Sequence, residues 1–463
     1  MRRRIGRLVA AWIAGCALLA LATTYHMMIG GDRLASDQAN PRVAQLRGAV
    51  HRGSILTSDG HPVASSPLAG GARLWHGPDS LAPVVGYVIP ALGVSGLESA
   101  CDGWLSGLRY GFQRTGILST LTGTPARGYD VVLTVHSRVQ QACERALAGR
   151  RGAAVVLDAA TGDILAVASS PWATPAQIEA ATDAVMARED SPLLSRALSG
   201  VYVPGSCIKP AIAAAAIDEG LLDPAADWLC QGWIRAGGTG VTDVPGGHGT
   251  LSLEGALALS CNTFFVELAL SAGARLRARL ERMGLDSGID LQLPTARARL
   301  GDGWHTPEGQ AQAAIGQGDM LVTPLHMAAL YAAFANGGVL VRPNLIRKVT
   351  DAHGRTVRQW RPDAGHRVIG RDAVSAVEVG LLSAVEWGTA SLAANPGRQV
   401  FGKTGTAENP AGAPHAWFCG YVRTAAGTAA LSIVIENGGS GGAVAAPLAR
   451  DIIQSLLAFY EGR

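Results

Sequence analysis

The sequence predicts an α+β fold in which a sheet is built from both ends of the main region and helices surround it. Apolar runs with strand-like composition begin at residue 129, and similar runs return after residue 415. The stretch between them carries helical spacing, most clearly in the run AIAAAAIDEG. Strands at both ends and helices in the middle favour an α+β arrangement.

The expected elements follow in order along the chain. YDVVLTV predicts a strand, VQQACERAL a helix, and AAVVLDAATGDILAVASS two strands joined at a turn. A helix is expected to start near Ser206 and end at Gly220, because glycine commonly terminates helices. Near the C-terminus, AWFCGYV and AALSIVIEN predict adjacent strands, and APLARDIIQSLLAFYE predicts a closing amphipathic helix.

Composition excludes several classes of protein. Hydrophobic residues make up 48% of the 463 residues and charged residues only 16%, which excludes a disordered chain. The net charge is +3, and no dense basic run lies beyond the N-terminus, so no nucleic-acid partner is expected. The seven cysteines form no C-x-x-C pair and the histidines no H-x-x-x-H pair, so we expect no metal and no cofactor.

The N-terminus predicts a membrane anchor. Four arginines precede an apolar run at residues 8–29, which would span about 33 Å as a helix. The arginines favour a cytoplasmic start and an extracytoplasmic remainder. Ala20-Leu21-Ala22 resembles a signal-peptidase site and Ile13-Ala14-Gly15-Cys16 a lipidation site, but each would cut inside the apolar run. We therefore favour an uncleaved single-pass anchor in the bacterial cytoplasmic membrane, with disulfides possible beyond it.

The stretch VPGSCIKP predicts a nucleophile with a lysine base. Ser206 and Lys209 are three residues apart, so on a helix they share a face, whereas Cys207 points elsewhere. A serine hydroxyl needs a base to remove its proton, and a lysine serves only when burial or a second cation lowers its pKa. Near a helix N-terminus, free N–H groups can stabilise an oxyanion.

Two further boxes support this prediction. Ser260-Cys261-Asn262 gives S-x-N, and Lys403-Thr404-Gly405-Thr406 contains K-T-G. S-x-x-K, an S-D-N box and K-T-G are the signature set of penicillin-binding proteins and class A β-lactamases. All three occur here in that order, with cysteine replacing aspartate in the middle box.

Over nearly its whole length the chain resembles class B penicillin-binding proteins, the anchored D,D-transpeptidases of peptidoglycan synthesis. Beyond the boxes, the resemblance is carried by HRGSILTSDGHPVASS, SGLESACDGWLSG, GAAVVLDAATGDILAVASSP and IGQGDMLVTPLHMAALYAAFANGG. It implies an antiparallel sheet flanked by helices, the serine β-lactamase/D,D-transpeptidase fold. The expected organisation is a cytoplasmic stub and anchor at 1–30, a linker at 31–44, a small pedestal module at 45–128 and a transpeptidase domain at 129–463.

The resemblance also implies roles for the residues of the first two boxes. Ser206 would be acylated by a donor stem peptide, with Lys209 as its general base. Ser260 would pass a proton to the departing D-alanine, and Asn262 would hold the substrate and Lys209. Lys403 would add positive charge that keeps Lys209 neutral.

The third box would bind the substrate. Thr404 and Thr406 would hold the terminal carboxylate, and Gly405 would let the substrate backbone lie against the strand. The backbone N–H groups of Ser206 and Thr406 would form the oxyanion hole.

The expected activity is cross-linking of peptidoglycan stem peptides, with β-lactams as inhibitors and a separate membrane glycan polymerase as partner, because the region before residue 129 is too short for a polymerase domain. A β-lactamase, a D,D-carboxypeptidase and a non-catalytic scaffold are the alternatives.

Three features lie outside these roles. Cys207 and Cys261 are expected to be packing residues, although a disulfide between them is an alternative. Ser440, in a G-x-S-x-G match with no histidine after it, is expected in a flexible loop, and His415 is expected to be structural or at the rim of the site.

Overall fold

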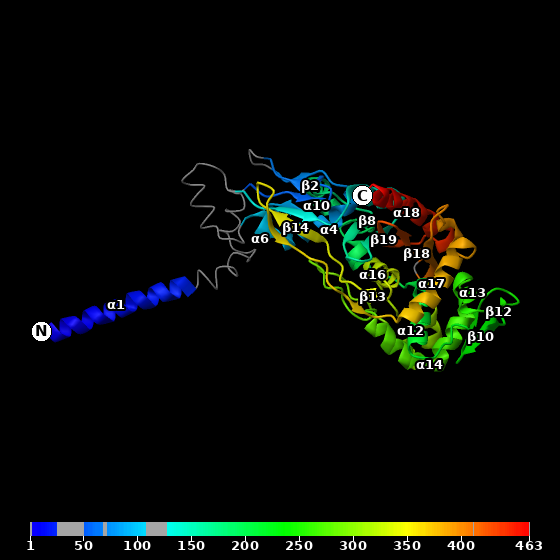
Figure 1. Ribbon diagram of the computed structural model, residues 1–463. Helices are drawn as coiled ribbons and strands as arrows, with labels where there is room; N and C mark the ends of the chain where they lie inside the picture. The colour runs from blue at the N-terminus through cyan, green and yellow to red at the C-terminus, as the bar shows by residue number, and fades with distance from the viewer. Residues whose placement is uncertain (1, 26–50, 68–71, 108–126, 411, 463) are drawn as a thin grey trace.

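The computed structural model describes residues 2–25, 51–67, 72–107, 127–410 and 412–462. The predicted linker at 31–44 lies outside the described residues, as do positions 26–29 of the predicted anchor and residues 45–50, 68–71 and 108–126 of the predicted pedestal. Figure 1 shows the path of the chain from blue at the N-terminus to red at the C-terminus.

The central sheet has five strands in the order β17-β18-β19-β7-β8, and every neighbouring pair is antiparallel. The strands are β7 (Gly152–Asp158), β8 (Ile164–Ser170), β17 (Val400–Asn409), β18 (Gly412–Thr424) and β19 (Gly427–Ile435). The pairing of β19 with β7 joins the two ends of the main region, with Val434 opposite Ala153. This confirms the predicted antiparallel sheet built from both chain ends.

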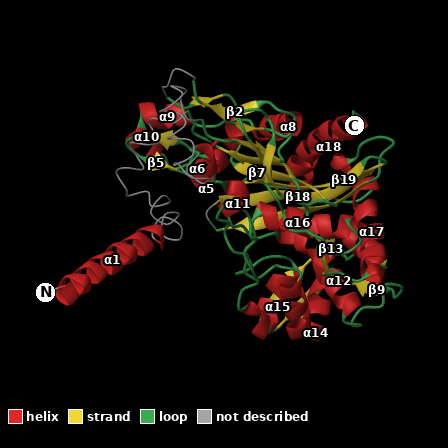
Figure 2. Ribbon diagram, turned by 60° about the vertical axis from the view of Figure 1, so that its left-hand side comes forward, coloured by secondary structure: helices red, strands yellow, loops and turns green. Residues whose placement is uncertain are grey.

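Helices cover both faces of this sheet, as Figure 2 shows. On one face, α8 (Ser137–Leu147) and α18 (Ala446–Glu461) pack together against alternate side chains such as Val156. On the other face, α16 (Pro324–Ala335) packs against β7 and β19, in the core that includes Val155. Successive side chains of a strand point to opposite faces, so a strand covered on both sides reads as a continuous apolar run.

The helical middle of the chain lies below the sheet in Figure 2 and meets β17 through α17. Its main helices are α12 (Lys209–Asp218), α13 (Leu253–Ala258), α14 (Asn262–Arg282), α15 (Pro307–Ala314) and α17 (Arg371–Glu386). The two-stranded pairs are β9 (Trp228–Cys230) with β12 (Gly249–Leu251), β10 (Trp233–Ala236) with β11 (Thr239–Thr242), β13 (Val339–Leu340) with β16 (His366–Arg367), and β4 (Val88–Ile89) with β5 (Gly93–Val94). The short helices are α4 (Ala82–Val85), α5 (Gly96–Ala100), α6 (Asp102–Leu105), α9 (Pro175–Ala180), α10 (Thr182–Met186) and α11 (Arg196–Ser199).

A second sheet combines three distant parts of the chain in the order β15-β14-β6-β1-β2-β3. Its strands are β1 (Ile55–Leu56), β2 (Pro62–Ser65), β3 (Leu74–Trp75), β6 (Asp130–Leu133), β14 (Ile346–Thr350) and β15 (Thr356–Gln359). Since β6 pairs with both β1 and β14, the predicted boundary at residues 128/129 runs through this sheet. The division of the chain at that point stays a prediction.

A buried ionic network holds the described part of the N-terminal region together. Arg52 Nε lies 2.7 Å from Glu98 Oε2, and Arg52 Nη1 lies 2.6 Å from Asp102 Oδ1. Arg73 Nε binds the other oxygen of Glu98 at 2.7 Å. Arg52 of the segment HRGSILTSDGHPVASS therefore binds Glu98 and Asp102 of the segment SGLESACDGWLSG and joins these two distant parts of the sequence.

Two helices of the described chain are long and apolar enough to cross a membrane. The first is Arg4–Tyr25, within α1 (Arg2–Tyr25), and it has no buried part. The second, Gly441–Glu461, is 44% buried and contains α18, which packs on the central sheet. The second therefore belongs to the core of the folded domain, and α1 coincides with most of the predicted anchor.

Candidate active site

The nucleophile box forms a tight turn that leads into a helix. Gly205–Ile208 make a 3₁₀ turn, and α12 continues from Lys209. Gly205 adopts a φ of +54°, and its N–H donates to Gly316 O at 2.8 Å. A side chain at Gly205 would also approach Thr406 O to 3.0 Å. Ser206 is half-buried, so this turn presents the hydroxyl near a helix start, as predicted.

Lys209 is fully buried and connects the first two boxes. Its Nζ donates to Ser260 O at 2.7 Å, to Asn262 Oδ1 at 2.7 Å and to Ser260 Oγ at 3.2 Å. Among the described residues it makes no hydrogen bond to Ser206 Oγ, so the predicted direct contact is absent from this state. Catalytic hydrogen bonds often form at full strength only in the substrate complex.

The pKa of both active-site lysines is lowered. Burial, followed by repulsion from Lys403, lowers the pKa of Lys209 to about 7, although Asp243 and Cys261 oppose the shift. Burial also lowers the pKa of Lys403 to about 8, with Cys207 opposing. Near neutral pH, Lys209 is therefore available as a base while Lys403 still carries most of its charge.

The S-x-N box is a strained turn between α13 and α14. Ser260 has a φ of +61°, a conformation that side chains other than glycine rarely adopt and that clusters at functional sites. Asn262 begins α14, and its Nδ2 donates to Thr242 O at 3.2 Å while its Oδ1 accepts from Lys209. The orientation of the amide is thus determined at both ends.

The K-T-G box lies on β17, the edge strand of the central sheet. Lys403 is buried and its Nζ donates to Thr404 O at 3.2 Å and to Thr389 Oγ1 at 3.5 Å. Thr404 Oγ1 lies 3.2 Å from Thr389 Oγ1, and Thr406 Oγ1 accepts from Gly441 N at 3.3 Å. The sequence analysis missed Thr389, because a single threonine after a helix carries no signal until β17 is placed beside it.

Gly405 is required by a close approach of the protein's own chain. A Cβ at this position would lie 2.8 Å from Pro204 O and 3.0 Å from Cys207 Sγ. The predicted reason for the glycine was passage of the substrate backbone. The structure provides another: only a glycine lets β17 pack this closely against the nucleophile turn.

The remaining candidates have structural contacts. All seven cysteines are free thiols: Cys207 Sγ donates to Lys403 O at 3.3 Å, whereas Cys261 Sγ donates to Asp243 Oδ2 at 3.2 Å, so the alternative Cys207–Cys261 disulfide is absent. Ser440 is the exposed last residue of a loop and caps the helical turn Gly441–Ala445, and the predicted flexibility of the loop stays a prediction. His415 Nδ1 accepts from Asn437 N at 3.1 Å, in agreement with a structural role.

The fold and site define a class of enzyme. A half-buried serine at a helix start, a buried lysine of lowered pKa beside it and an edge strand facing both are the parts of a serine acyltransferase. The buried lysine one turn from the serine, Lys209, is the candidate for the base.

Comparison with known proteins identifies the family. Residues 152–454 match the penicillin binding protein transpeptidase domain, and residues 52–131 match the penicillin binding protein A dimerisation domain. The chain belongs to the penicillin-binding protein transpeptidase family, and it is a serine-type transpeptidase.

Similar proteins cover almost the whole chain. The peptidoglycan D,D-transpeptidase PbpA of Mycolicibacterium smegmatis is 31% identical over 99% of both chains, and that of Mycobacterium tuberculosis is 32% identical over 98% of both. A penicillin G acyl-enzyme complex of penicillin-binding protein A from M. tuberculosis superposes with a TM-score of 0.81 at 30% identity, covering 88% of this chain and 100% of that one. A D,D-transpeptidase domain from Eggerthella lenta gives 0.80 at 32% identity, covering 89% and 99%.

Proposed function

We propose that this chain is a peptidoglycan D,D-transpeptidase that forms its acyl-enzyme on Ser206. The observation that carries the proposal is the position of Lys209, which is buried, hydrogen-bonded to both residues of the S-x-N box and one turn from Ser206. The relatives that cover this chain from end to end are named for the same activity.

In the first half-reaction, neutral Lys209 accepts the proton of Ser206 Oγ as that oxygen attacks the carbonyl of the penultimate D-alanine. The N–H groups of Ser206 and Thr406 stabilise the oxyanion, and each such donor is worth about 10²–10³ in rate. When the peptide bond breaks, the proton passes through Ser260 to the nitrogen of the departing D-alanine. The donor peptide then remains as an ester on Ser206.

In the second half-reaction, an amine of another stem peptide attacks this ester. Its proton passes to Lys209 and then to Ser206 as the ester bond breaks, and a new peptide bond forms. One peptide bond is broken and one is made, so the cross-link needs no nucleotide.

Substrate binding is assigned to β17. Because β17 is an edge strand, an extended peptide can pair with its free backbone groups, and Lys403, Thr404 and Thr406 then receive the terminal carboxylate. Asn262 binds the peptide and keeps Lys209 in place. Thr389 joins this set as a positioning residue, because it binds the side chains of both Lys403 and Thr404.

The chain is proposed to act as a single-pass membrane protein. α1 is apolar and exposed after a start rich in arginine, so residues 8–29 anchor the protein and the catalytic domain lies outside the cytoplasmic membrane. A separate membrane glycan polymerase supplies the strands that are cross-linked.

Labelling with a fluorescent penicillin tests the function. The purified full-length protein is expected to form a lasting adduct that peptide mapping places on Ser206. Ser206→Ala should abolish labelling and cross-linking, while Ser440→Ala, a serine in a decoy motif, should retain both. Unchanged labelling and cross-linking in Ser206→Ala would establish the scaffold alternative. Rapid loss of the adduct would support a β-lactamase, and release of D-alanine without cross-links would support a carboxypeptidase.

A further inference from the structure

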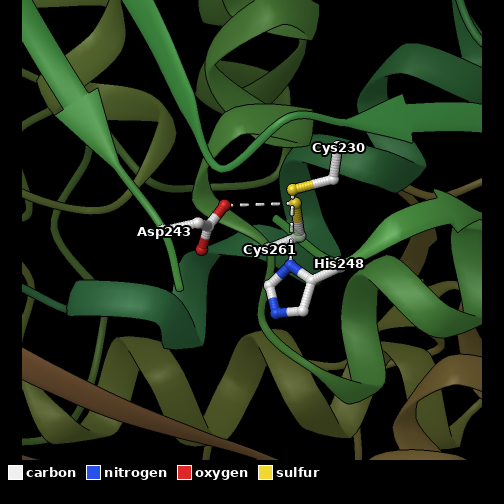
Figure 3. A group of neighbouring side chains, drawn as sticks. All are labelled: Cys230, Asp243, His248 and Cys261. Atoms are coloured by element: carbon white, nitrogen blue, oxygen red, sulfur yellow. Dashed lines mark hydrogen bonds between the residues drawn. The ribbon is translucent and has the colours of Figure 1, made fainter. Parts of the chain in front are cut away.

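Behind the S-x-N box, four side chains with metal-ligand chemistry converge: Cys230, Asp243, His248 and Cys261. Their ligand atoms all lie within 4.8 Å of one another. Figure 3 shows the two sulfurs, the carboxylate and Nδ1 of the imidazole directed toward one point. Both cysteines are buried, whereas Asp243 and His248 are half-buried.

The four residues come from four separate places in the fold. Cys230 ends β9, Asp243 follows β11, His248 precedes β12 and Cys261 precedes the first residue of α14. No pair has the spacing of a C-x-x-C or H-x-x-x-H motif, and for that reason no metal was expected from the sequence. The cluster forms only when the two-stranded pairs β9–β12 and β10–β11 fold over the start of α14.

The distances fit a tetrahedral ion. Cys230 Sγ lies 3.4 Å from His248 Nδ1, and Cys261 Sγ lies 3.2 Å from Asp243 Oδ2. With metal–ligand bonds of about 2.0–2.3 Å, neighbouring ligand atoms of a tetrahedral zinc are roughly 3.3–3.8 Å apart. These two separations are close to that range, and no two ligand atoms lie further apart than 4.8 Å, so the side chains must draw together by about 1 Å to surround one ion.

Thr263 contacts three of the four residues. Its backbone N–H and its hydroxyl donate to Asp243 Oδ2 at 2.9 and 3.1 Å. The same hydroxyl lies 3.3 Å from the sulfurs of both Cys230 and Cys261. Metal ligands are commonly oriented in this way by an outer hydrogen-bond donor.

We propose that Cys230, Asp243, His248 and Cys261 bind a structural Zn²⁺ ion. Two thiolates and an imidazole favour zinc over magnesium or calcium, which prefer oxygen ligands. Four protein ligands close the coordination sphere, so the ion has a structural role and not a catalytic one.

The ion would stabilise the turn that carries the S-x-N box. Cys261 lies between Ser260 and Asn262, and Asp243 follows Thr242, whose carbonyl receives the Asn262 amide. One ion would thus link the segment that carries Thr242 to the turn that carries Asn262 and the strained Ser260. This consequence rests on the catalytic roles proposed for those two residues, whereas the metal site itself does not.

The surrounding segment packs on α14 but buries few side chains of its own. β10 and β11 form a two-stranded ribbon in which only Ala236 and Val241 are buried, and β9 and β12 form another short pair. Isolated two-stranded ribbons are marginally stable, and small units often depend on a metal to hold them. In Figure 1 these ribbons lie at the end of the folded body away from β2.

Metal analysis of the full-length protein tests the proposal without any variant. Protein purified in detergent without chelator from zinc-supplemented cells is expected to hold about one zinc per chain. Replacement by Co²⁺ should give the visible absorption of a tetrahedral cobalt–thiolate site. Alkylation of the unfolded protein without reductant should modify all seven cysteines. Absence of zinc and of the cobalt spectrum, or a Cys230–Cys261 disulfide, would overturn the proposal.

A pair of variants connects the ion to the site. Cys230→Ser combined with His248→Ala should lower zinc affinity at least tenfold, because the loss of even an outer-shell partner of a metal ligand typically costs about 10–100-fold. The double variant should also slow penicillin acylation. Cys143→Ala, which removes a buried thiol far from the cluster, should keep zinc and acylation. Zinc retained by the double variant would contradict the site. Zinc bound by a wild-type protein that no penicillin acylates would leave the metal site standing and refute the transpeptidase mechanism.

Discussion

At the scale of single residues, the site depends on two buried lysines held near each other. Lys209 and Lys403 come from distant parts of the chain, and each is fully buried. Burial alone lowers the pKa of either group, and the charge of Lys403 lowers the pKa of Lys209 further. The two lysines therefore differ in charge over a narrow range of pH, which the proposed mechanism requires.

The rate of penicillin acylation should follow a bell-shaped pH profile. It should rise as Lys209 loses its proton near pH 7 and fall as Lys403 loses its proton near pH 8. Stopped-flow measurement of acylation between pH 5.5 and 9.5 checks this. Lys403→Arg keeps the charge at high pH, so the alkaline limb should disappear while the acidic limb stays near pH 7. A profile that is flat through this range would contradict the assigned roles.

Stability should show the same lysine shift. Because the folded pKa of Lys209 is below its unfolded value, the unfolded chain binds more protons between pH 7 and about 10, and this group makes stability rise with pH there. The contribution is constant below pH 7, where both states are protonated. Denaturant unfolding across this range should therefore show a steeper rise for the wild type than for Lys209→Met.

Gly405→Ala should slow acylation by about 10²-fold, because the new methyl group would meet Pro204 O at 2.8 Å and displace the nucleophile turn from β17. Comparison of acylation rates with the wild type checks this. Gly288→Ala is the matched control, since a Cβ there meets no atom within 4 Å. An unchanged rate in Gly405→Ala would mean that the turn and the strand move apart at no cost.

At the scale of elements, long apolar runs were predictable and short pairings were not. β7 and β8 each have seven buried residues in a row, and their composition alone predicted strands. β1, by contrast, has two residues and pairs with β6 in parallel some 76 positions away, which leaves no local pattern. The three boxes were found from their order, whereas Thr389 and Asp243 join the site only through contacts between distant segments.

Glu98→Gln should destabilise the described N-terminal region by about 3–5 kcal/mol, because it leaves the buried guanidinium of Arg73 without its counter-charge and leaves Arg52 with Asp102 alone. Denaturant unfolding monitored with limited proteolysis of this region checks this. Asp351→Asn, in a pair with the exposed Arg355, should change stability far less. Equal effects of the two changes would refute a special role for the buried network.

At the scale of the whole molecule, the apolar helix α1 and the folded body are structurally independent. α1 contributes nothing to any of the three buried clusters, and the catalytic domain encloses its own core on both faces of the central sheet. The described body from residue 51 onward should therefore fold without the anchor.

A chain that begins at residue 31 should leave the membrane and still react with penicillin. Carbonate extraction of cells should find the full-length protein in the membrane fraction and the shortened protein in the soluble one. Both should be labelled at Ser206 at similar rates. A shortened chain that still resists extraction would point to a second membrane contact on the folded body.

Because β19 pairs with β7, the central sheet cannot be completed until the C-terminal strands have been synthesised. Val434 pairs with Ala153 from about 280 positions further along the chain, a stretch that takes roughly 15–60 s to synthesise at about 5–20 residues per second. During that interval β7 and β8 have emerged with both apolar faces and one edge uncovered, and such surfaces associate readily with other chains. Ser206 has also been synthesised by then, but its site is incomplete until β17 emerges. Protection of these surfaces until β17, β18 and β19 have been synthesised, and not the chemistry of the site, would then limit the yield of active protein.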